Sequence, residues 1–381
     1  MLNHPLAHPE LSVAAERVAD LAAPLAARAD SDRQLDRTVV DALLDAGFAR
    51  HFVPTRWGGR EGSFAEITEA LTVLAAGCAS TAWCASIAAT LGRMAAYLPA
   101  EGQSEVWARG PDAFICGALM PAGRAESVDG GYRVSGEWAY MSGVEFSDWA
   151  LVCSTVAVGE RPEVRFFLVP RSAYRITDTW FNLGMRGTGS NTLVLGETFV
   201  PGSRSFTRDE LVEGRAADAT AACHNVPLRA VNSLSFAAPA LGAARGAART
   251  WSALVAPKIR AFTGNNRISG GDRGTLEIAF ARATGEMDAA QLLVDRAAGI
   301  ADQGAVTVEH TLRNARDSAV AVDLLASAVN RLFRVVGTRG QSEGHPFQRF
   351  WRDVHTATGH TVLQVDPAAS AYGNHVLLRE T

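Results

Sequence analysis

The segment from Gly136 to Gly143 has aromatic and hydroxyl side chains at a spacing that could bind a flat ring. Trp138 and Tyr140 are two residues apart, so a strand would place both on one face, and Ser142 follows them. A serine hydroxyl can hydrogen-bond the edge of a ring, and a neighbouring glycine lets the backbone approach it closely. A strand of core aromatics that ends in a polar turn has the same pattern, and the pattern alone favours this structural interpretation.

Residues 184–191 form a second polar segment, in which three glycines alternate with other residue types. Arg186, Thr188 and Ser190 contribute a guanidinium group and two hydroxyls. The backbone N–H groups and hydroxyls of such a loop can bind a phosphate or the edge of a ring. A tight β-turn loop has a similar composition, so the segment alone supports both interpretations equally.

Asp353 and His360 form a third candidate group near the C-terminus. They are seven residues apart, so a continuous helix would place both on one face. A histidine here could act as a general base or as a hydrogen-bonding partner at neutral pH. A histidine with a purely structural role is the commoner alternative.

Several motifs of other enzyme classes are missing from the sequence. There is no G-x-G-x-x-G after a strand, no nucleotide P-loop, and no G-x-S-x-G of the hydrolases. His355 and His360 are five residues apart, which is not the metal-binding i, i+4 spacing, and no Cys/His cluster occurs. We predict no metal site. Redox chemistry would therefore need a cofactor that is held without a Rossmann unit.

The elements that must position these residues follow from the hydrophobic periodicity, which changes twice along the chain. Residues 11–109 read as helices, residues 114–206 as closely spaced strands of a barrel or sandwich, and the helical period returns after Pro227. We expect three domains: helical at 1–112, β at 113–206 and helical at 207–381.

Glycine and proline positions predict particular turns within these domains. Gly130-Gly131 is typical of a β-hairpin turn. Gly77 and Pro99 bound two helices within residues 64–98 that are apolar nearly all round, which indicates that both are buried.

Composition excludes some classes of partner. The net charge of -4 and the pI of about 6.2 give no electrostatic reason to bind nucleic acid or an anionic membrane. We find no secretory signal and no membrane-spanning apolar run, and expect a cytoplasmic protein. The five cysteines form no C-x-x-C motif, so we expect buried free thiols; they are Cys78, Cys84, Cys116, Cys153 and Cys223.

Several runs resemble one branch of the acyl-CoA dehydrogenase superfamily, the reduced-flavin-dependent monooxygenases. Residues 56–59 (RWGG), 79–83 (ASTAW) and 184–191 (GMRGTGSN) are similar to that branch. Residues 93–99 (RMAAYLP) and 241–247 (LGAARGA) look like the aromatic polyketide hydroxylase of the actinorhodin pathway. The resemblance covers essentially the whole chain.

The resemblance implies a mainly α fold with an N-terminal helical domain, a middle β-barrel and a C-terminal four-helix bundle, usually in a homotetramer. It implies the oxygenase component of a two-component enzyme. Such an enzyme hydroxylates an aromatic polyketide of the naphthoquinone or pyranonaphthoquinone type through a flavin C4a-hydroperoxide. The cofactors would be molecular oxygen and reduced FMN, with FAD as the alternative. A separate NAD(P)H-dependent flavin reductase would supply the reduced flavin.

Roles for individual residues follow from the same resemblance. Ser142 matches the residue that hydrogen-bonds near flavin N5, and His360 matches a catalytic histidine that either deprotonates a phenol or holds the distal peroxide oxygen. Other expected flavin contacts are Trp138, Tyr140, Arg186, Thr188, Ser190 and, through the flavin phosphate, Arg260. Relatives have a substrate-binding histidine about eight residues after the tryptophan that corresponds to Trp83; here Thr90 and Leu91 occupy that region, and His224 and Asn225 are the replacement candidates.

Three alternatives stay open at this stage. An N-oxygenase or indole monooxygenase of the same branch would differ only in substrate. An acyl-CoA dehydrogenase would need a carboxylate base, yet Thr361 stands nine residues after Arg352, where many such enzymes have glutamate. A catalytically silent scaffold would bind flavin without changing its reaction with oxygen.

Overall fold

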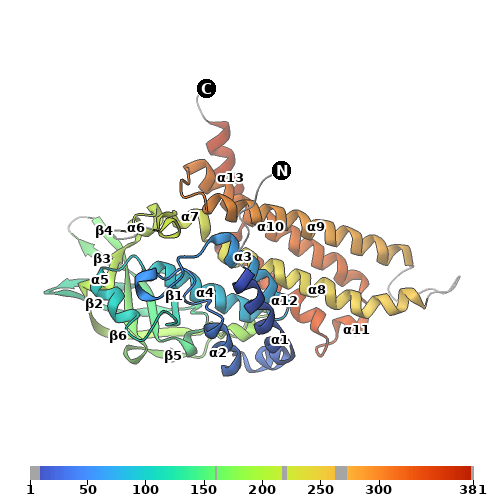
Figure 1. Ribbon diagram of the computed structural model, residues 1–381, viewed down its shortest axis with the longest axis horizontal. Coiled ribbons are helices and arrows are strands. Elements are labelled where there is room, and N and C mark those ends of the chain that lie inside the picture. The colour runs from blue at the N-terminus through green and yellow to red at the C-terminus, as the bar shows by residue number, and fades with distance from the viewer. Residues whose placement is uncertain (1–8, 159–160, 217–220, 262–272, 379–381) are drawn as a thin grey trace.

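The computed structural model describes residues 9–158, 161–216, 221–261 and 273–378, which form helices, then a sheet, then helices (Figure 1). This order confirms the prediction from periodicity. The exact domain limits remain predictions. The five cysteines are all buried and free, as expected.

The N-terminal part is helical, and its helices begin at the residue types that cap helices. Asp36 accepts a hydrogen bond from Thr38 N, and Ser63 accepts one from Glu66 N. A Cβ on Gly77 would lie 2.7 Å from Ala19 O, so this break between two buried helices requires glycine. The helices are α1 (Pro9–Asp32), α2 (Arg37–Asp45), α3 (Phe64–Ala75), α4 (Ala79–Ala95) and α5 (Ala100–Val106).

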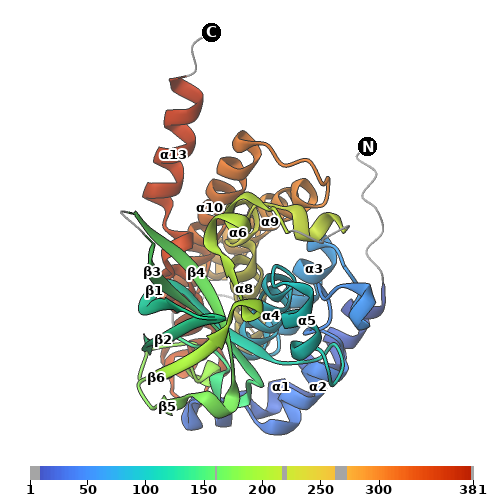
Figure 2. The same cartoon turned by 90° about the vertical axis from the view of Figure 1, so that its left-hand side faces the viewer.

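The middle part is one seven-stranded sheet of order β5-β6-β2-β1-β3-β4-β7. Strands β1 and β3 are parallel and the other pairs antiparallel, and the predicted turn at Gly130 joins β1 to β2. The described strands leave β5 and β7 as sheet edges, so a closed barrel is not confirmed (Figure 2). The strands are β1 (Ile115–Val128), β2 (Gly131–Trp138), β3 (Trp149–Val158), β4 (Arg161–Pro170), β5 (Arg175–Thr177), β6 (Thr192–Pro201) and β7 (Ser205–Thr207).

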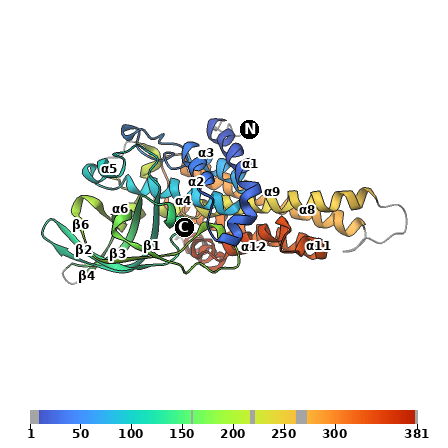
Figure 3. The same cartoon turned by 90° about the horizontal axis from the view of Figure 1, so that it is seen from below.

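The C-terminal part is built on three long helices that lie side by side, α8, α9 and α10 (Figures 1 and 3). The shorter α12 packs on α8 and α10, and α13 projects from the body. A four-helix bundle remains a prediction in its details. The helices are α6 (Arg208–Glu213), α7 (Leu228–Val231), α8 (Leu234–Arg260), α9 (Arg273–Ala301), α10 (Val308–Val335), α11 (Thr338–Gln341), α12 (Pro346–Thr358) and α13 (Val365–Leu377). No helix in the described ranges is long and apolar enough to span a bilayer.

Helix α4 connects the three parts. It packs against α3 and α8 and also against β1 of the sheet. Most of its residues are small and almost all are buried, which allows this close packing on several sides. Residues on α4 therefore meet side chains from both the sheet loops and the C-terminal helices.

Candidate active site

Three hydroxyl side chains meet where the loop after β2 lies against the loop before β6. The Oγ atoms of Ser142 and Ser190 are 2.8 Å apart, and Ser190 Oγ lies 2.6 Å from Thr188 Oγ1. All three side chains are buried. The sequence predicted each of them separately, and the structure brings them together as a hydroxyl cluster.

Backbone hydrogen bonds hold the two loops together. Gly143 N donates to Thr188 O at 2.9 Å, and Met141 N donates to Asn191 O at 3.1 Å. Tyr140 and Met185 have positive φ angles of 64° and 51°, a conformation that non-glycine residues rarely adopt. Strained residues of this kind persist only where the surroundings fix them, as at many functional sites.

Trp83 on α4 completes the hydroxyl cluster, because its Nε1–H donates to Ser142 Oγ at 3.2 Å. At the other end, Thr188 Oγ1 donates to Met185 O at 2.8 Å. A hydroxyl has one hydrogen, so Ser190 must donate to Thr188, and Ser142 must donate to Ser190. The bonds thus run in one direction, from Trp83 to Met185. Ser142 Oγ keeps one lone pair for which the described residues provide no donor.

Aromatic side chains lie beside this chain of hydrogen bonds. The His360 ring stacks on Phe236 with centroids 3.9 Å apart, and its edge faces Trp83 at 5.9 Å. Trp83 and Phe236 are in contact at 4.8 Å. The three rings form an aromatic wall built from α4, α8 and the turn after α12.

The electrostatic state of His360 follows from its burial. Desolvation lowers the pKa of His360 to about 4, so the imidazole is neutral at pH 7. Its Nδ1 accepts a hydrogen bond from Val362 N at 3.4 Å, which places the ring hydrogen on Nε2. His360 therefore offers an N–H donor rather than a free base.

The expectation that Asp353 and His360 share one helix face is wrong. Helix α12 ends at Thr358, and His360 has an extended backbone with φ -69° and ψ 132°. Asp353 instead accepts a hydrogen bond from Met185 N at 2.6 Å. Burial raises the pKa of Asp353 to about 6. Asp353 thus holds the loop before β6, which carries Thr188 and Ser190.

Arg352 and Asp30 also hold the loop before β6, and the sequence analysis did not predict this role for either residue. Arg352 donates to Leu183 O at 2.6 Å and to both carboxylate oxygens of Asp30, at 3.0 and 2.8 Å. Arg186 lies 3.5 Å from the same carboxylate. Asp30 is 322 residues from Arg352 in sequence, and no local pattern indicates that pairing.

The predicted residues Trp138 and Tyr140 lie outside the cluster. Trp138 is buried in the sheet, where its Nε1 donates to Cys153 O at 2.7 Å. Glycine at position 123 leaves room for its ring, since a Cβ there would lie 2.2 Å from it. Tyr140 is 73% exposed, and the edge of its ring contacts Trp180.

Arg260, His224 and Asn225 are also separated from the cluster. Arg260 is exposed in the last turn of α8, 24 residues after Phe236 and so about 36 Å away along the helix. His224 is buried, and its Nε2 is bonded to Phe52 O. Asn225 is exposed and donates to Ala221 O. Their predicted contacts with flavin or substrate remain predictions.

Phe236 and the donor role of Trp83 were not predicted. Trp83 is the one large aromatic in the otherwise small-residue run 79–89, which was a usable signal. Phe236 has no such signal, because an aromatic near the start of a long helix is usually a core residue.

The cluster suits the edge of a flat, polar cofactor such as a flavin. Ser142 has a free lone pair, and Arg186 Nε is buried with no hydrogen-bond partner in the described part of the chain. Both belong to the loops that the resemblance places beside the ring. The aromatic wall supplies apolar surface next to them.

Comparison with known proteins identifies the family of the chain. The family described as acyl-CoA dehydrogenase, N-terminal domain, matches residues 10–108, and the C-terminal domain of that name matches residues 234–365. The oxygenase component of FADH(2)-dependent resorcinol hydroxylase from Rhizobium sp. (strain MTP-10005) is 33% identical over 379 residues, 94% of this chain and 92% of the relative.

Solved structures give the same result over the full fold. The 3-HSA hydroxylase from Rhodococcus sp. RHA1 has a TM-score of 0.92 and 28% identity, and covers 98% of both chains. XiaF from Streptomyces sp., in complex with FADH2 and glycerol, has a TM-score of 0.87 and 28% identity over 98% of this chain and 97% of its own. The chain belongs to the oxygenase components of two-component, flavin-dependent monooxygenases with the acyl-CoA dehydrogenase fold.

Proposed function

We propose that the protein hydroxylates the aromatic ring of a small phenolic substrate, with reduced flavin and molecular oxygen as cosubstrates. The observation that carries this proposal is the one-directional chain of hydrogen bonds from Trp83 to Met185 beside the aromatic wall. It is supported by the hydroxylase names of the relatives. Reduced flavin, when bound, supplies the electrons that activate oxygen.

Ser142 would contact the flavin as a hydrogen-bond acceptor. Its own hydrogen is committed to Ser190, and Trp83 occupies one of its lone pairs. The remaining lone pair suits an N–H on the edge of the reduced ring, as the resemblance implies for N5. An accepted hydrogen bond holds that proton in place, and loss of hydrogen peroxide requires its removal. Ser142 therefore favours hydroxylation over peroxide release.

His360 would act as a hydrogen-bond donor rather than as the base for a phenol. A phenol has a pKa of roughly 10, so proton transfer to a group with a pKa of about 4 is uphill by about 8 kcal/mol. The Nε2–H of His360 is instead suited to hold an oxygen atom at the reacting centre. The buried rings of Trp83 and Phe236 beside it exclude water.

A dehydrogenase reaction is not favoured by this geometry. Thr361 is exposed and has no carboxylate. Asp353, the last acid of α12, is buried and bonded to Met185 N, which leaves it unsuited to abstract a substrate proton.

The substrate's ring system is a finer part of the proposal. The runs 93–99 and 241–247 suggested a polycyclic polyketide quinone, and both contain residues with structural contacts. Tyr97 donates to His224 O, and a Cβ on Gly242 would lie 2.2 Å from Thr72 O on α3. Polycyclic quinones therefore belong in a substrate panel beside monocyclic phenols, indoles and amines.

Reductase and assembly complete the proposal. The relatives' designation as oxygenase components supports a separate NAD(P)H-dependent flavin reductase. We keep the homotetramer as a proposal, and the exposed Leu377 at the projecting end of α13 and Leu378 directly after it are apolar surface that contact with another copy would bury (Figure 2). Light scattering on the purified protein tests it.

Rapid mixing tests the function directly. Protein with reduced FAD or reduced FMN is mixed anaerobically and then exposed to oxygen, and flavin absorbance is followed. FAD is tried first, because two relatives are named with FADH2. We expect a transient absorbance that belongs to neither reduced nor oxidised flavin, and hydroxylated product when a phenol is present. Direct reoxidation at the rate of free flavin, with both flavins, would contradict the proposal.

A further inference from the structure

Arg93 on α4 is a buried cation without a carboxylate partner. Its side chain is 1% exposed, and no Asp or Glu forms an ion pair with it within the described ranges. Its Nε donates to Cys223 O at 2.6 Å, and its Nη2 donates to Val226 O. The rings of Phe64 and Tyr97 lie 5.5 and 6.0 Å from its Cζ. Carbonyls and rings offset part of the charge, but none of them neutralises it.

One nitrogen of this guanidinium remains unused. Nη1 of Arg93 is buried and has no hydrogen-bond partner among the described residues. A buried charged donor without an acceptor is unfavourable, which makes such atoms rare in folded proteins. Burial lowers the pKa of Arg93, but an arginine remains protonated. The described part of the protein therefore contains a buried positive charge that no carboxylate neutralises.

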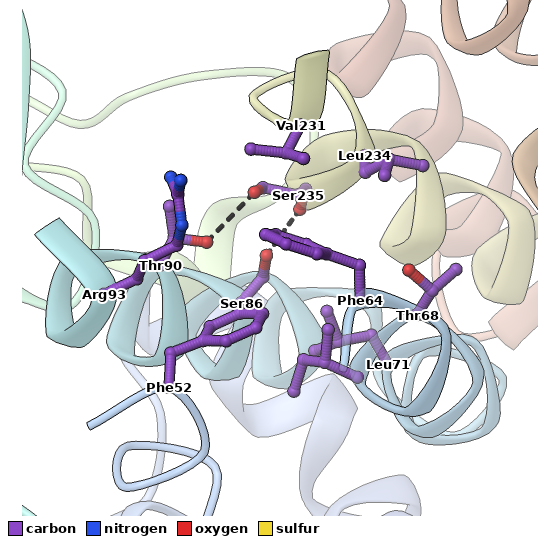
Figure 4. A pocket seen from close by; sticks show the side chains of 11 residues that line it. Phe52, Phe64, Thr68, Leu71, Ser86, Thr90, Arg93, Val231, Leu234 and Ser235 are labelled. Carbon is purple, nitrogen blue, oxygen red and sulfur yellow. Dashed lines mark hydrogen bonds between the residues drawn. The ribbon is translucent and has the colours of Figure 1, made fainter. Parts of the chain in front are cut away.

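A small cavity lies at this charge. Its volume is about 20 Å³, enough for roughly one water molecule or one oxygen atom of a ligand. Its polar lining is Arg93, Thr90, Ser86, Ser235 and Thr68, and aromatic and aliphatic side chains such as Phe52 complete it (Figure 4).

The hydroxyls of the cavity supply a second donor. Ser86 Oγ donates to Ser235 O at 2.6 Å, so its hydrogen is used. Thr90 Oγ1 and Ser235 Oγ are 2.9 Å apart, and one of the two donates to the other. That pair has two hydrogens and uses one, which leaves one O–H for a further acceptor. An oxygen atom in the cavity would thus meet this hydroxyl and the Nη1–H of Arg93.

The cavity and the candidate active site share one face of α4. Trp83, Ser86, Thr90 and Arg93 are at positions i, i+3, i+7 and i+10, which lie along one stripe of a helix. Thr90 is about 10 Å from Trp83 along the helix axis. On α8, Ser235 of the cavity directly precedes Phe236 of the aromatic wall. The stripe therefore has a residue of the candidate active site, Trp83, at one end and the buried charge of Arg93 at the other.

We propose that this cavity, the Arg93 subsite, binds a carboxylate oxygen on the side chain of an aromatic substrate whose ring lies at the aromatic wall. The proposal rests on the proposed function and adds the substrate class, phenols with an acidic side chain. An anion is favoured over a neutral carbonyl because only an anion neutralises the guanidinium.

The test compares each acid with its neutral amide. Substrates are (4-hydroxyphenyl)-acetate, -propanoate, -butanoate and -pentanoate, each beside its primary amide of nearly the same shape. We measure kcat/KM for hydroxylation and, independently, equilibrium binding through tryptophan fluorescence. One of these side chains should be long enough to reach from the aromatic wall to the Arg93 subsite. For that substrate we expect an acid-to-amide ratio of about tenfold or more in both measurements. A ratio near one at every length would overturn the proposal.

Variants of the cavity test whether a preference for the acid over the amide arises at the Arg93 subsite. Arg93→Met should lower the acid-to-amide ratio about tenfold, and an unchanged ratio would overturn the assignment. Because Arg93 also binds two backbone carbonyls, Thr90→Val and Ser235→Ala carry the test if Arg93→Met does not fold; each should lower the ratio twofold to fivefold. Thr72→Val is the matched control, since it removes a buried hydroxyl of α3 outside the cavity and should leave the ratio unchanged.

The binding measurement separates the two proposals. If no phenol is hydroxylated, the proposed function fails, yet the affinities for acid and amide still decide the subsite. If phenols are hydroxylated without acid preference in rate or binding, the function stands and the Arg93 subsite is refuted.

Discussion

Trp83 Nε1 donates a hydrogen bond to Ser142 Oγ across 3.2 Å, and this contact fixes what Ser142 can do. With Trp83 as its donor and Ser190 as its acceptor, Ser142 can add only another donor, such as a ring N–H. A helix of the N-terminal part thereby sets the hydrogen-bonding polarity of a residue in the sheet loops.

Replacing Trp83 by phenylalanine should lower the yield of product per reduced flavin and raise hydrogen peroxide release. Loss of a hydrogen bond of about 1 kcal/mol corresponds to roughly a fivefold change in this partition. Trp251→Phe is the matched control, because Trp251 Nε1 makes a similar buried bond to Leu332 O within the C-terminal helices. The control should lower stability but leave peroxide release unchanged. Equal peroxide release by both variants would disprove the role of Trp83.

Ser142→Ala should increase peroxide release more than Ser190→Ala. The first variant removes the acceptor for the ring N–H, whereas the second only frees the hydrogen of Ser142 to point elsewhere. Peroxide and product are measured per oxidised flavin in single-turnover experiments. The reverse order, or no change in either variant, would refute the direction inferred for these bonds.

Titration of His360 should not change the coupling of flavin oxidation to hydroxylation between pH 6 and 8. Burial holds the pKa of His360 at about 4, so the ring stays neutral throughout this range. His360→Asn keeps an N–H donor and should retain more coupling than His360→Ala. An inflection near pH 6.5 in the wild type that vanishes in His360→Asn would show instead that His360 titrates as a base.

Asp353→Ala should loosen the loop that carries Thr188 and Ser190. It leaves Met185 N–H buried without an acceptor, at a cost of about 1–3 kcal/mol in unfolding free energy, and should weaken binding of reduced flavin severalfold. Asp353→Asn keeps an acceptor and should bind flavin almost as the wild type does. Urea unfolding and flavin titration measure the two effects.

The same variants give a pH test. The pKa of Asp353 is raised to about 6 from an ordinary value of 3.8, so its contribution to stability is complete below pH 3.8 and is lost as the pH rises through 6. The loss amounts to about 3 kcal/mol. The amide in the Asp353→Asn variant does not titrate, so the variant does not lose this stability. Its unfolding free energy should therefore rise relative to that of the wild type between pH 4 and 7. Parallel pH profiles would contradict the raised pKa.

Much of the fold could be predicted from the sequence because local chemistry determines it. The turn at Gly130 and the break at Gly77 are positions that only a small or flexible residue can occupy. The order of helices and strands follows the period of apolar residues. The edges of the sheet could not be predicted, since strand periodicity does not tell whether a sheet closes.

The site was predictable only in part, because tertiary contacts assemble it. Ser142, Thr188 and Ser190 belong to loops with unusual glycine content, which singled them out. Phe236 looks like an ordinary core residue in the sequence, and the burial of Arg93 follows only from the packing of α8 against α4. His360 was selected from the sequence, and its ring lies against Phe236 and Trp83, but its catalytic role remains a prediction. The expected helix face is absent because α12 ends at Thr358, two residues before His360.

Because α4 carries Trp83 and Arg93 on one rigid helix, it also acts as a spacer of fixed length between the two ends of a substrate. The position of an anchoring cation on this stripe can change only by three or four residues at a time, which are steps of about 4.5 or 6 Å. Moving the arginine three residues toward Trp83, from position 93 to position 90, would therefore select substrates shorter by about 4.5 Å. Diversification within such enzymes would then proceed in discrete steps of substrate length rather than by gradual adjustment.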